Sequence, residues 1–236
     1  MKLFRNKEAS EPLLEGSGAD HFVVERAEML EKQLRRRGVQ DSGVLSAMAA
    51  VRREEFVPRE FRQRAYEDAP LPIGEGQTIS QPYIVAAMTA ALHLTGSERL
   101  LEIGTGCGYQ AAILSHLGRI VFSIESRSEL ASSAAARLER LGYANVHVHC
   151  GDGTLGLPEL APFDAILVAA AAPAVPAPLR SQLAEGGRLI LPVGDAENQE
   201  LLRLERHGDS FETRTLEACR FVPLIGYYGW KEPPAR

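Results

Sequence analysis

Residues 99–108 read Arg-Leu-Leu-Glu-Ile-Gly-Thr-Gly-Cys-Gly, and this stretch decides the fold. Its first half, residues 99–103, has the short apolar character of a buried strand, and a helix is expected from Tyr109. The glycines between them let the backbone turn sharply and approach a ligand closely, while a helix start offers free N–H groups. The stretch therefore predicts a ligand-binding turn between a strand and a helix.

Strand and helix patterns alternate from Pro82 to Pro192. The expected strands are residues 99–103, 120–124, 146–150, 163–169 and 188–192. The expected helices are residues 82–94, 109–117, 128–141 and 177–183. Alternation of this kind predicts a mostly parallel, doubly wound Rossmann-like sheet, with ligands at the carboxyl ends of the strands. Two further strands, residues 199–206 and 213–222, are expected to add an antiparallel C-terminal edge.

The chain before this core divides into three parts. Residues 1–20 mix charged and small residues and are expected to form a flexible extension without a signal peptide or a membrane span. Helices are expected at residues 21–37, where Gly38 follows three arginines, and from Asp41 onward. The region from Arg52 to Gln81 is rich in Pro, Gly and charge, and irregular segments of this length usually serve function.

These parts predict a single domain. Residues 21–81 are expected to supply N-terminal helices and an active-site loop that pack on the core, residues 82–236. With 236 residues the chain is long enough to bury one sizeable core, and two full domains would be too many.

The bulk composition excludes several classes of function. The chain is 45% hydrophobic and 24% charged, with a net charge of −5. Proteins that bind the nucleic-acid backbone normally carry a basic surface, so no nucleic-acid partner is expected. The three cysteines are too few and too widely spaced for a disulfide framework or a zinc site. We therefore expect no metal, no membrane association, a cytoplasmic location and a monomer.

The spacing of the glycine turn favours S-adenosylmethionine over a dinucleotide. A dinucleotide fingerprint, Gly-x-Gly-x-x-Gly, needs glycine where Tyr109 stands. Glu102 is placed to compensate a cationic ligand, directly or through water, and would repel a pyrophosphate. Glu125 ends the next strand, from which a carboxylate accepts hydrogen bonds from ribose hydroxyls, and Asp152 ends the third, where it can receive the adenine amino group. The predicted cofactor-binding residues of the core are Glu102, Gly104, Thr105, Gly106, Gly108, Tyr109, Glu125, Gly151, Asp152 and Gly153.

Each of these side chains also has an ordinary structural explanation. Glu102 fits a partner of a helix N-terminus, Glu125 a solvated strand end and Asp152 a helix cap. Cys107 has no activating residue beside it in sequence, so it is expected to be a small filler and not a nucleophile. Three acidic strand ends together with the glycine turn favour the sulfonium cofactor.

Several segments resemble the protein-L-isoaspartate (D-aspartate) O-methyltransferase family. They are Phe56-Val57-Pro58, Ala65-Tyr66-Glu67-Asp68, Leu71-Pro72-Ile73-Gly74, Gly76-Gln77-Thr78-Ile79-Ser80-Gln81-Pro82, Glu102-Ile103-Gly104-Thr105-Gly106, Gly151-Asp152-Gly153, Pro162-Phe163-Asp164-Ala165-Ile166, Ala170-Ala171-Ala172-Pro173, Gly186-Gly187-Arg188-Leu189 and Arg220-Phe221-Val222-Pro223-Leu224. The segment ending at Ser80-Gln81-Pro82 is the most specific, because many methyltransferases share the glycine turn. The resemblance implies methyl esterification of L-isoaspartyl and D-aspartyl carboxylates in damaged proteins and peptides, with S-adenosyl-L-homocysteine as the cofactor product.

The resemblance also implies that Ser80 is the active-site residue. The acceptor carboxylate is ionised and nucleophilic at neutral pH, so it needs alignment more than a strong base, and a serine hydroxyl can orient it. The ester then lets a neighbouring backbone nitrogen close a succinimide that can reopen as normal aspartate. From the residues alone, Ser80 is better explained as the N-cap of the following helix.

The same resemblance places further residues around Ser80. The additional cofactor-binding residues are Gln77, Thr78, Ile79 and Tyr83. The substrate-binding residues are Thr78, Ile79, Ser80, Arg220 and Val222. Tyr83 also fits an ordinary aromatic on a helix face.

Two other functions compete with this prediction. A methyltransferase of the same fold acting on a small molecule or RNA would carry a different loop at residues 77–82. A noncatalytic binding protein would have lost Glu102, Asp152 or the glycines, and all are present. The chain departs from the family pattern in residues 1–20, in Cys107, where serine is more familiar, and in the tail Tyr227-Tyr228-Gly229-Trp230.

Overall fold

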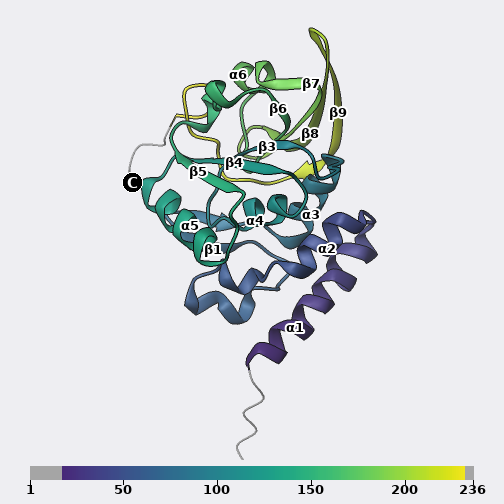
Figure 1. Ribbon diagram of the computed structural model, residues 1–236, viewed down its shortest axis with the longest axis vertical. Helices are drawn as coiled ribbons and strands as arrows, with labels where there is room; N and C mark the ends of the chain where they lie inside the picture. The colour runs from purple at the N-terminus through teal and green to yellow at the C-terminus, as the bar shows by residue number, and fades with distance from the viewer. Residues whose placement is uncertain (1–17, 232–236) are drawn as a thin grey trace, which may run out of the picture.

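The computed structural model describes residues 18–231, and a twisted central sheet lies between layers of helices (Figure 1). The strands of this sheet are β3 (Arg99–Ile103), β4 (Ile120–Glu125), β5 (Val146–Cys150), β6 (Phe163–Val168), β7 (Leu183–Gly194), β8 (Gln199–His207) and β9 (Ser210–Cys219). Their spatial order is β5-β4-β3-β6-β7-β8-β9. The pairs from β5 to β7 are parallel, and β8 and β9 add antiparallel strands. The predicted sheet with an antiparallel C-terminal edge is therefore confirmed.

The order of the strands places the site. The chain runs from β3 outward through β4 to β5 and then returns to β6 on the other side of β3. Ligands of open α/β sheets bind outside the carboxyl ends of the strands where the order reverses in this way. Here Gly104 follows β3 and Ala169 follows β6. A Cβ atom on Gly104 would lie 3.6 Å from the Ala169 side chain, so the two strand ends lie side by side.

Helices cover both faces of the sheet. The core helices are α3 (Pro82–Ala91), α4 (Tyr109–Ser115), α5 (Ser128–Arg140) and α6 (Ala177–Ser181). In Figure 1, α3, α4 and α5 lie on the face toward the N-terminal helices, and α6 lies on the opposite face. Buried residues of α4 and α5, such as Ala111 and Leu138, share one apolar cluster with Met29 and Met48 of the N-terminal helices. The N-terminal layer is thus packed on the core through a continuous apolar interface.

The N-terminal layer begins with a long helical segment. Helix α1 (Gly18–Glu28) continues through a π-helical turn, Met29–Leu34, and a 3-10 turn, Arg35–Arg37. The segment ends at Gly38, whose φ of 92° is the left-handed conformation that glycine adopts readily at a helix end. The expected stop is therefore confirmed, but the helix starts at Gly18, inside the expected extension. The rest of that extension, residues 1–17, lies outside the described residues.

The region from Arg52 to Gln81 contains more structure than its composition indicated. After α2 (Ser42–Ala50), which the Asp41 side chain caps, two 3-10 turns form at Arg53–Glu55 and Arg59–Arg64. A hairpin follows, made of β1 (Leu71–Gly74) and β2 (Gln77–Ile79). Its strands are only four and three residues long, and Pro72 interrupts the first, so no alternating pattern long enough to predict them exists.

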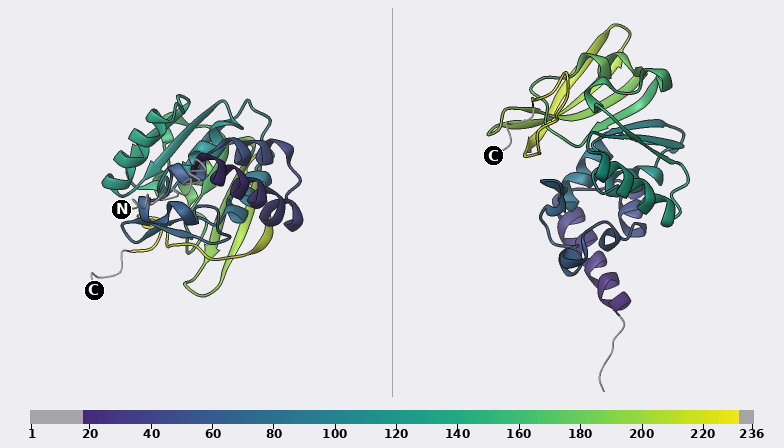
Figure 2. Two further views of the ribbon diagram at one scale, coloured as in Figure 1. Left: turned by 90° about the horizontal axis from the view of Figure 1, so that it is seen from below. Right: turned by 90° about the vertical axis from the view of Figure 1, so that its left-hand side faces the viewer.

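The C-terminal half differs from expectation mainly at β7. This strand begins at Leu183, although a helix was expected to reach that residue, because α6 ends at Ser181. The register of its pairing with β6 shifts between Phe163 and Ala165, and Gly186 and Gly187 lie within β7. Glycine inside a strand often marks a bulge, which explains why strand and helix signals overlap here. Figure 2 shows the β8–β9 hairpin at the end of the molecule remote from the N-terminal helices.

Within residues 18–231 the structure holds no helix that is both long and apolar enough to cross a membrane. The same part of the chain contains no cluster of three or more His, Cys, Asp or Glu side chains arranged to hold a metal ion.

Candidate active site

The glycine turn joins β3 to α4 in a conformation that requires glycine. Gly104, Gly106 and Gly108 have φ values of 93°, 53° and 90°, which L side chains rarely adopt. A Cβ atom on Gly106 would lie 3.2 Å from the Ile73 side chain, so the β1–β2 hairpin packs directly on the turn. The turn is therefore fixed from both sides, by the sheet below and by the hairpin above.

Glu125 holds the turn from the end of β4. Its Oε2 accepts a hydrogen bond of 2.9 Å from the Gly106 amide, and its Oε1 accepts one of 3.1 Å from the Arg127 amide and a longer one of 3.4 Å from the Ser126 hydroxyl. The side chain is 7% exposed and lines the pocket beside the turn. A carboxylate has about four acceptor positions. Glu125 therefore keeps capacity for a ligand hydroxyl.

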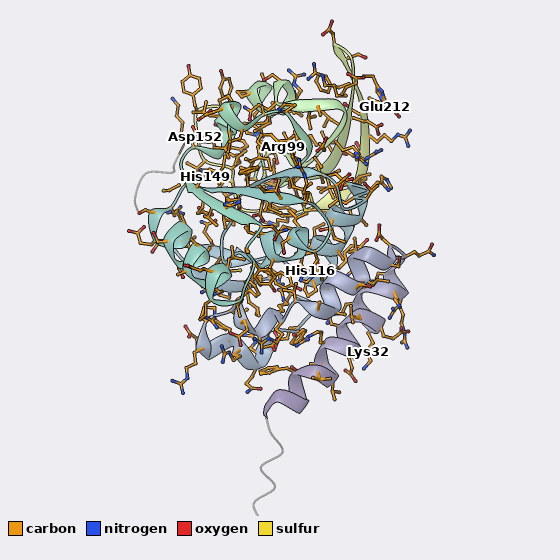
Figure 3. The ribbon with its side chains drawn as sticks, in the orientation of Figure 1. Lys32, Arg99, His116, His149, Asp152 and Glu212 are labelled. Carbon is orange, nitrogen blue, oxygen red and sulfur yellow. The ribbon has the colours of Figure 1, made fainter. Side chains whose placement is uncertain are left out.

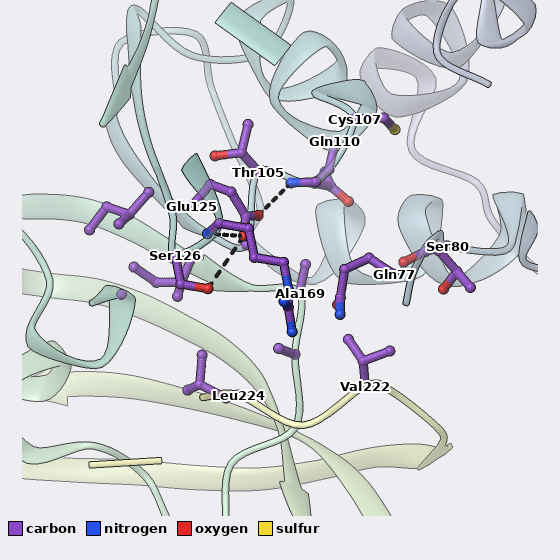
Figure 4. Close-up of a pocket in the computed structure, with 18 of the residues that line it drawn as sticks. Gln77, Ser80, Thr105, Cys107, Gln110, Glu125, Ser126, Ala169, Val222 and Leu224 are labelled. Atoms are coloured by element: carbon purple, nitrogen blue, oxygen red, sulfur yellow. Dashed lines mark hydrogen bonds between the residues drawn. The ribbon is translucent and has the colours of Figure 1, made fainter. Parts of the chain in front are cut away.

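A pocket lies beside the turn. In Figure 4, Gln77 and Ser80 lie on one side of it, Glu125 and Ser126 on the other, and Val222 and Leu224 on a third. The predicted site residues that line this pocket are Gln77, Thr78, Ile79, Ser80, Gly104, Thr105, Gly106, Tyr109, Glu125, Gly153 and Val222. Five separate segments of the sequence thus meet around one cavity.

Glu102 lies beneath the pocket and does not line it. The side chain is fully buried, and Ser123 donates a hydrogen bond to its Oε2. The Ser123 hydroxyl is in turn 2.5 Å from the hydroxyl of Thr105, which does line the pocket. Burial raises the pKa of Glu102 to about 8, and its Oε1 has no hydrogen-bond partner. Glu102 is therefore connected to the pocket through Ser123 and Thr105 and does not itself form its wall.

Ser80 follows the hairpin and precedes α3. The N-cap of α3 is Gln81, without a side-chain capping bond, and Pro82 is the first helical residue. Within residues 18–231 the Ser80 hydroxyl makes no hydrogen bond, whereas its carbonyl accepts one from Arg53. The capping explanation of Ser80 is therefore wrong, and its half-buried hydroxyl faces the pocket unengaged (Figure 4).

A second groove adjoins the pocket. Thr78, Ser80, Ala169 and Val222 line both cavities, so they form the boundary between them. Tyr83 and Arg220 line only the groove.

Tyr83 is fixed within this groove. The Arg37 guanidinium lies 3.6 Å from the centre of the Tyr83 ring. Burial, with a contribution from the Glu217 carboxylate, raises the pKa of Tyr83. Tyr83 is therefore more than a helix-face aromatic, because it forms part of a groove wall.

Asp152 has a different set of partners from the one expected. Its Oδ1 accepts hydrogen bonds from the amide and hydroxyl of Thr154, at 2.8 and 2.6 Å, and its Oδ2 accepts one from the Tyr227 amide. Gly151, Asp152 and Gly108 do not line the pocket, although Gly153 does. Figure 3 places Asp152 near His149 at the β5 side of the sheet. Asp152 thus caps the 3-10 turn Gly153–Leu155, so the capping explanation of this residue is confirmed.

Several residues that line the pocket are not among the predicted site residues. The unexpected lining residues are Val85, Ile103, Cys107, Gln110, Ile124, Ser126, Arg127, Ala169, Ala170, Pro223, Leu224 and Ile225. Ser126 and Ala169 directly follow strands, so the rule that ligands bind at carboxyl strand ends could have found them. Gln110, by contrast, is a buried residue of α4 whose amide donates to the Thr89 hydroxyl, and no local pattern marks it. Burial raises the pKa of the Cys107 thiol, which agrees with its role as a filler.

Comparison with known proteins shows the family to which the chain belongs. Residues 25–228 match the family described as protein-L-isoaspartate(D-aspartate) O-methyltransferase. The chain belongs to this family. A protein-L-isoaspartate O-methyltransferase of Roseiflexus castenholzii is 58% identical over 89% of this chain and 95% of its own length. A second relative with that name, from Methanoculleus marisnigri, is 52% identical over 90% of this chain and 97% of its own length.

Two solved structures resemble the fold of the chain. A protein-L-isoaspartate O-methyltransferase superposes with a TM-score of 0.79 and 32% identity, covering 86% of this chain and 67% of that chain. A Plasmodium falciparum structure, described as a beta-aspartate methyltransferase in complex with S-adenosyl-L-homocysteine, has a TM-score of 0.75 and 26% identity. The match covers 85% of this chain and 98% of that chain. The predicted fold class and family resemblance are both confirmed.

Proposed function

We propose that the protein transfers a methyl group from S-adenosylmethionine to the carboxylate of L-isoaspartyl and D-aspartyl residues in damaged proteins and peptides, which starts their repair through a succinimide. The observation that carries the proposal is the meeting of the unengaged Ser80 hydroxyl with the glycine turn in one pocket. Membership of the family supplies the chemical class of the reaction.

The residues around the turn fit a sulfonium nucleoside. A side chain at Gly106 would crowd Ile73, and Glu125 has an acceptor position left for a ribose hydroxyl. No glycine stands at Tyr109, so the dinucleotide spacing is not met. We propose that the turn, Glu125 and the hairpin residues Gln77, Thr78 and Ile79 hold the cofactor, and that Glu102 acts on it only through Ser123 and Thr105.

The bound cofactor supplies an electrophilic methyl group on sulfur. The protein's own contribution is alignment, because the acceptor carboxylate is already ionised and nucleophilic at neutral pH. Ser80 donates a hydrogen bond that orients this carboxylate at the boundary between pocket and groove. Thr78 and Val222 line both cavities and exclude water there, while Tyr83 and Arg220 contact the peptide in the groove.

One assay tests the proposed function. The purified protein is given S-adenosylmethionine and either an isoaspartyl peptide or the aspartyl peptide of the same sequence, and ester formation is measured. We expect esterification of the isoaspartyl peptide alone. Ser80→Ala should lower turnover by about 10- to 100-fold and leave the affinity for S-adenosyl-L-homocysteine nearly unchanged, because it removes one orienting hydrogen bond. Binding of the cofactor without any esterification would contradict the proposal.

We also propose a cytoplasmic location and a protein substrate in preference to nucleic acid. All three cysteines are free in the structure, as in proteins of reducing compartments, and the net charge is −5. The monomeric state and the treatment of residues 21–236 as a single domain remain predictions.

A further inference from the structure

Arg53 is the largest fully buried side chain in the part of the protein that the structure describes. It is 0% exposed, and no carboxylate within residues 18–231 pairs with it. Its Nη1 has no hydrogen-bond partner, and burial lowers the pKa of its guanidinium. Because a buried cation without a counter-charge is costly, its contacts must offset a large desolvation penalty.

The contacts of Arg53 converge on the active-site loop. Its Nη2 donates a hydrogen bond of 2.7 Å to the Ser80 carbonyl, and its Nε donates one of 2.7 Å to the Ala65 carbonyl. The guanidinium lies 4.7 Å from the centre of the Tyr109 ring, so a cation–π interaction replaces part of the lost hydration. Tyr109 is itself 1% exposed and begins α4 directly after the glycine turn.

These contacts join the two halves of the proposed site. Ser80 belongs to the acceptor side and Tyr109 to the cofactor side, and both line the pocket. Arg53 comes from neither half, because it lies in the 3-10 turn Arg53–Glu55 of the N-terminal layer. Within the described chain, the Ser80 carbonyl accepts a hydrogen bond from Arg53 and from no other group. The position of the backbone that carries the Ser80 hydroxyl therefore depends on Arg53.

We infer that Arg53 is a positioning residue that fixes the Ser80 backbone relative to the glycine turn and thereby sets the alignment of acceptor and methyl donor. This inference rests on the proposed function of Ser80. A misplacement of about 1 Å at a reacting group can cost roughly 100-fold in rate. Arg53 therefore governs turnover without contacting substrate or cofactor.

The test compares Arg53→Met and Arg53→Lys with Arg26→Met as a matched control. Arg26 belongs to the same N-terminal layer and bonds Tyr66, Glu54 and the Ala49 carbonyl, but it contacts no residue of the pocket. For each variant, kcat, the KM for an isoaspartyl peptide, the Kd for S-adenosyl-L-homocysteine and the free energy of unfolding are measured. All rates are taken at a temperature at which each variant is folded.

We expect Arg53→Met to lower kcat by about 10- to 100-fold while the Kd changes less than about threefold. Arg53→Lys should restore part of kcat, because an ammonium can donate to one carbonyl but not to both in the guanidinium geometry. Arg26→Met should lower stability and leave kcat unchanged. If Arg53→Met does not fold, a kcat of Arg53→Lys clearly below that of Arg26→Met supports the inference, and an equal kcat overturns it.

Other outcomes separate this inference from the proposed function. A wild-type kcat in Arg53→Met, or a Kd that rises as much as kcat falls, overturns the positioning role alone. A wild-type protein that is silent on the isoaspartyl peptide overturns the proposed function itself. Full activity of Ser80→Ala overturns the proposed role of that serine, on which the inference rests.

Discussion

The Asp152 carboxylate accepts a hydrogen bond of 2.7 Å from the Tyr227 backbone amide, across 75 residues of sequence. Gly226 makes this approach possible, because a Cβ atom there would lie 2.0 Å from Asp152 Oδ1. The preceding residue, Ile225, lines the cofactor pocket. Asp152 therefore fastens the C-terminal segment to the pocket.

Asp152→Ala should weaken both stability and cofactor binding. It leaves the Tyr227 and Thr154 donors without their acceptor, and each unsatisfied group costs about 1–3 kcal/mol where it is buried. Urea denaturation should show a lower free energy of unfolding, and calorimetry a higher Kd for S-adenosyl-L-homocysteine. Glu159→Ala, at an exposed acidic position nearby, should change neither. Unchanged stability in Asp152→Ala would indicate that the carboxylate serves the ligand alone.

Glu125→Gln should weaken cofactor binding more than stability. The carboxylate accepts from the Gly106 and Arg127 amides on its two oxygens, and an amide NH2 group would face one of these donors. We expect the Kd for S-adenosyl-L-homocysteine to rise about 10- to 100-fold, which corresponds to roughly 1.4–2.8 kcal/mol. The measurement is calorimetric titration. Glu129→Gln, on the exposed side of α5, should bind normally, and an equal loss in both variants would contradict the assignment.

The sequence predicted the glycine turn and the strand ends well because both depend on local rules. Strands β3 and β5 have the expected bounds, and Gly104, Gly106 and Gly108 adopt conformations that only glycine tolerates readily. The partners of Asp152 were not predictable in this way. One of them, Tyr227, is distant in sequence, and nothing near Asp152 in the chain indicates that a backbone amide will occupy its free oxygen.

The same limit applies to Ser80 and Arg53. Ser80 precedes Gln81-Pro82, a local pattern that fits a helix cap, yet α3 begins one residue too late for that role. Arg53 stands in a run of charged residues, Arg52 to Glu55, that predicts a solvated segment. Its complete burial follows from carbonyls and a ring supplied by three other segments. Tertiary contacts of this kind leave no periodic or spacing signal.

Glu102→Gln should change how stability depends on pH. Burial raises the pKa of Glu102 from the usual 4.5 to about 8, so the folded protein holds this proton more tightly than the unfolded chain. The stabilising contribution is therefore complete below about pH 4.5 and is lost as pH rises through about 8. Glutamine is neutral at every pH and should escape this loss.

Denaturation of wild type and Glu102→Gln at pH 5, 7 and 9 measures the effect, and other titrating groups cancel in the difference between the two proteins. We expect similar stability at pH 5 and an advantage of about 1–3 kcal/mol for the variant at pH 9, the cost range of an uncompensated buried group. A wild type that is more stable than the variant at pH 9 would mean that Glu102 works in its ionised form.

Arg220→Ala should affect the peptide and spare the cofactor. Arg220 is exposed and lines the groove but not the cofactor pocket, from which Ser80 and Val222 separate it. An exposed charge contributes up to about 1 kcal/mol, so the KM for an isoaspartyl peptide should rise about two- to fivefold. The kcat and the Kd for S-adenosyl-L-homocysteine should stay near their wild-type values. Because salt screens exposed charges, the difference in KM should shrink at high ionic strength.

Arg214 provides the control for this prediction. It lies within β9, the strand that Arg220 directly follows, pairs with Glu212 and lines neither cavity. Arg214→Ala removes one positive charge, as Arg220→Ala does. Comparing the two variants therefore separates a local contact of Arg220 with the peptide from the effect of net charge on the electrostatic field of the protein. An equal rise in KM for the two variants would show that Arg220 acts only through net charge. A rise confined to Arg220→Ala would place the peptide along the segment that leaves β9 and passes Ser80 at Val222.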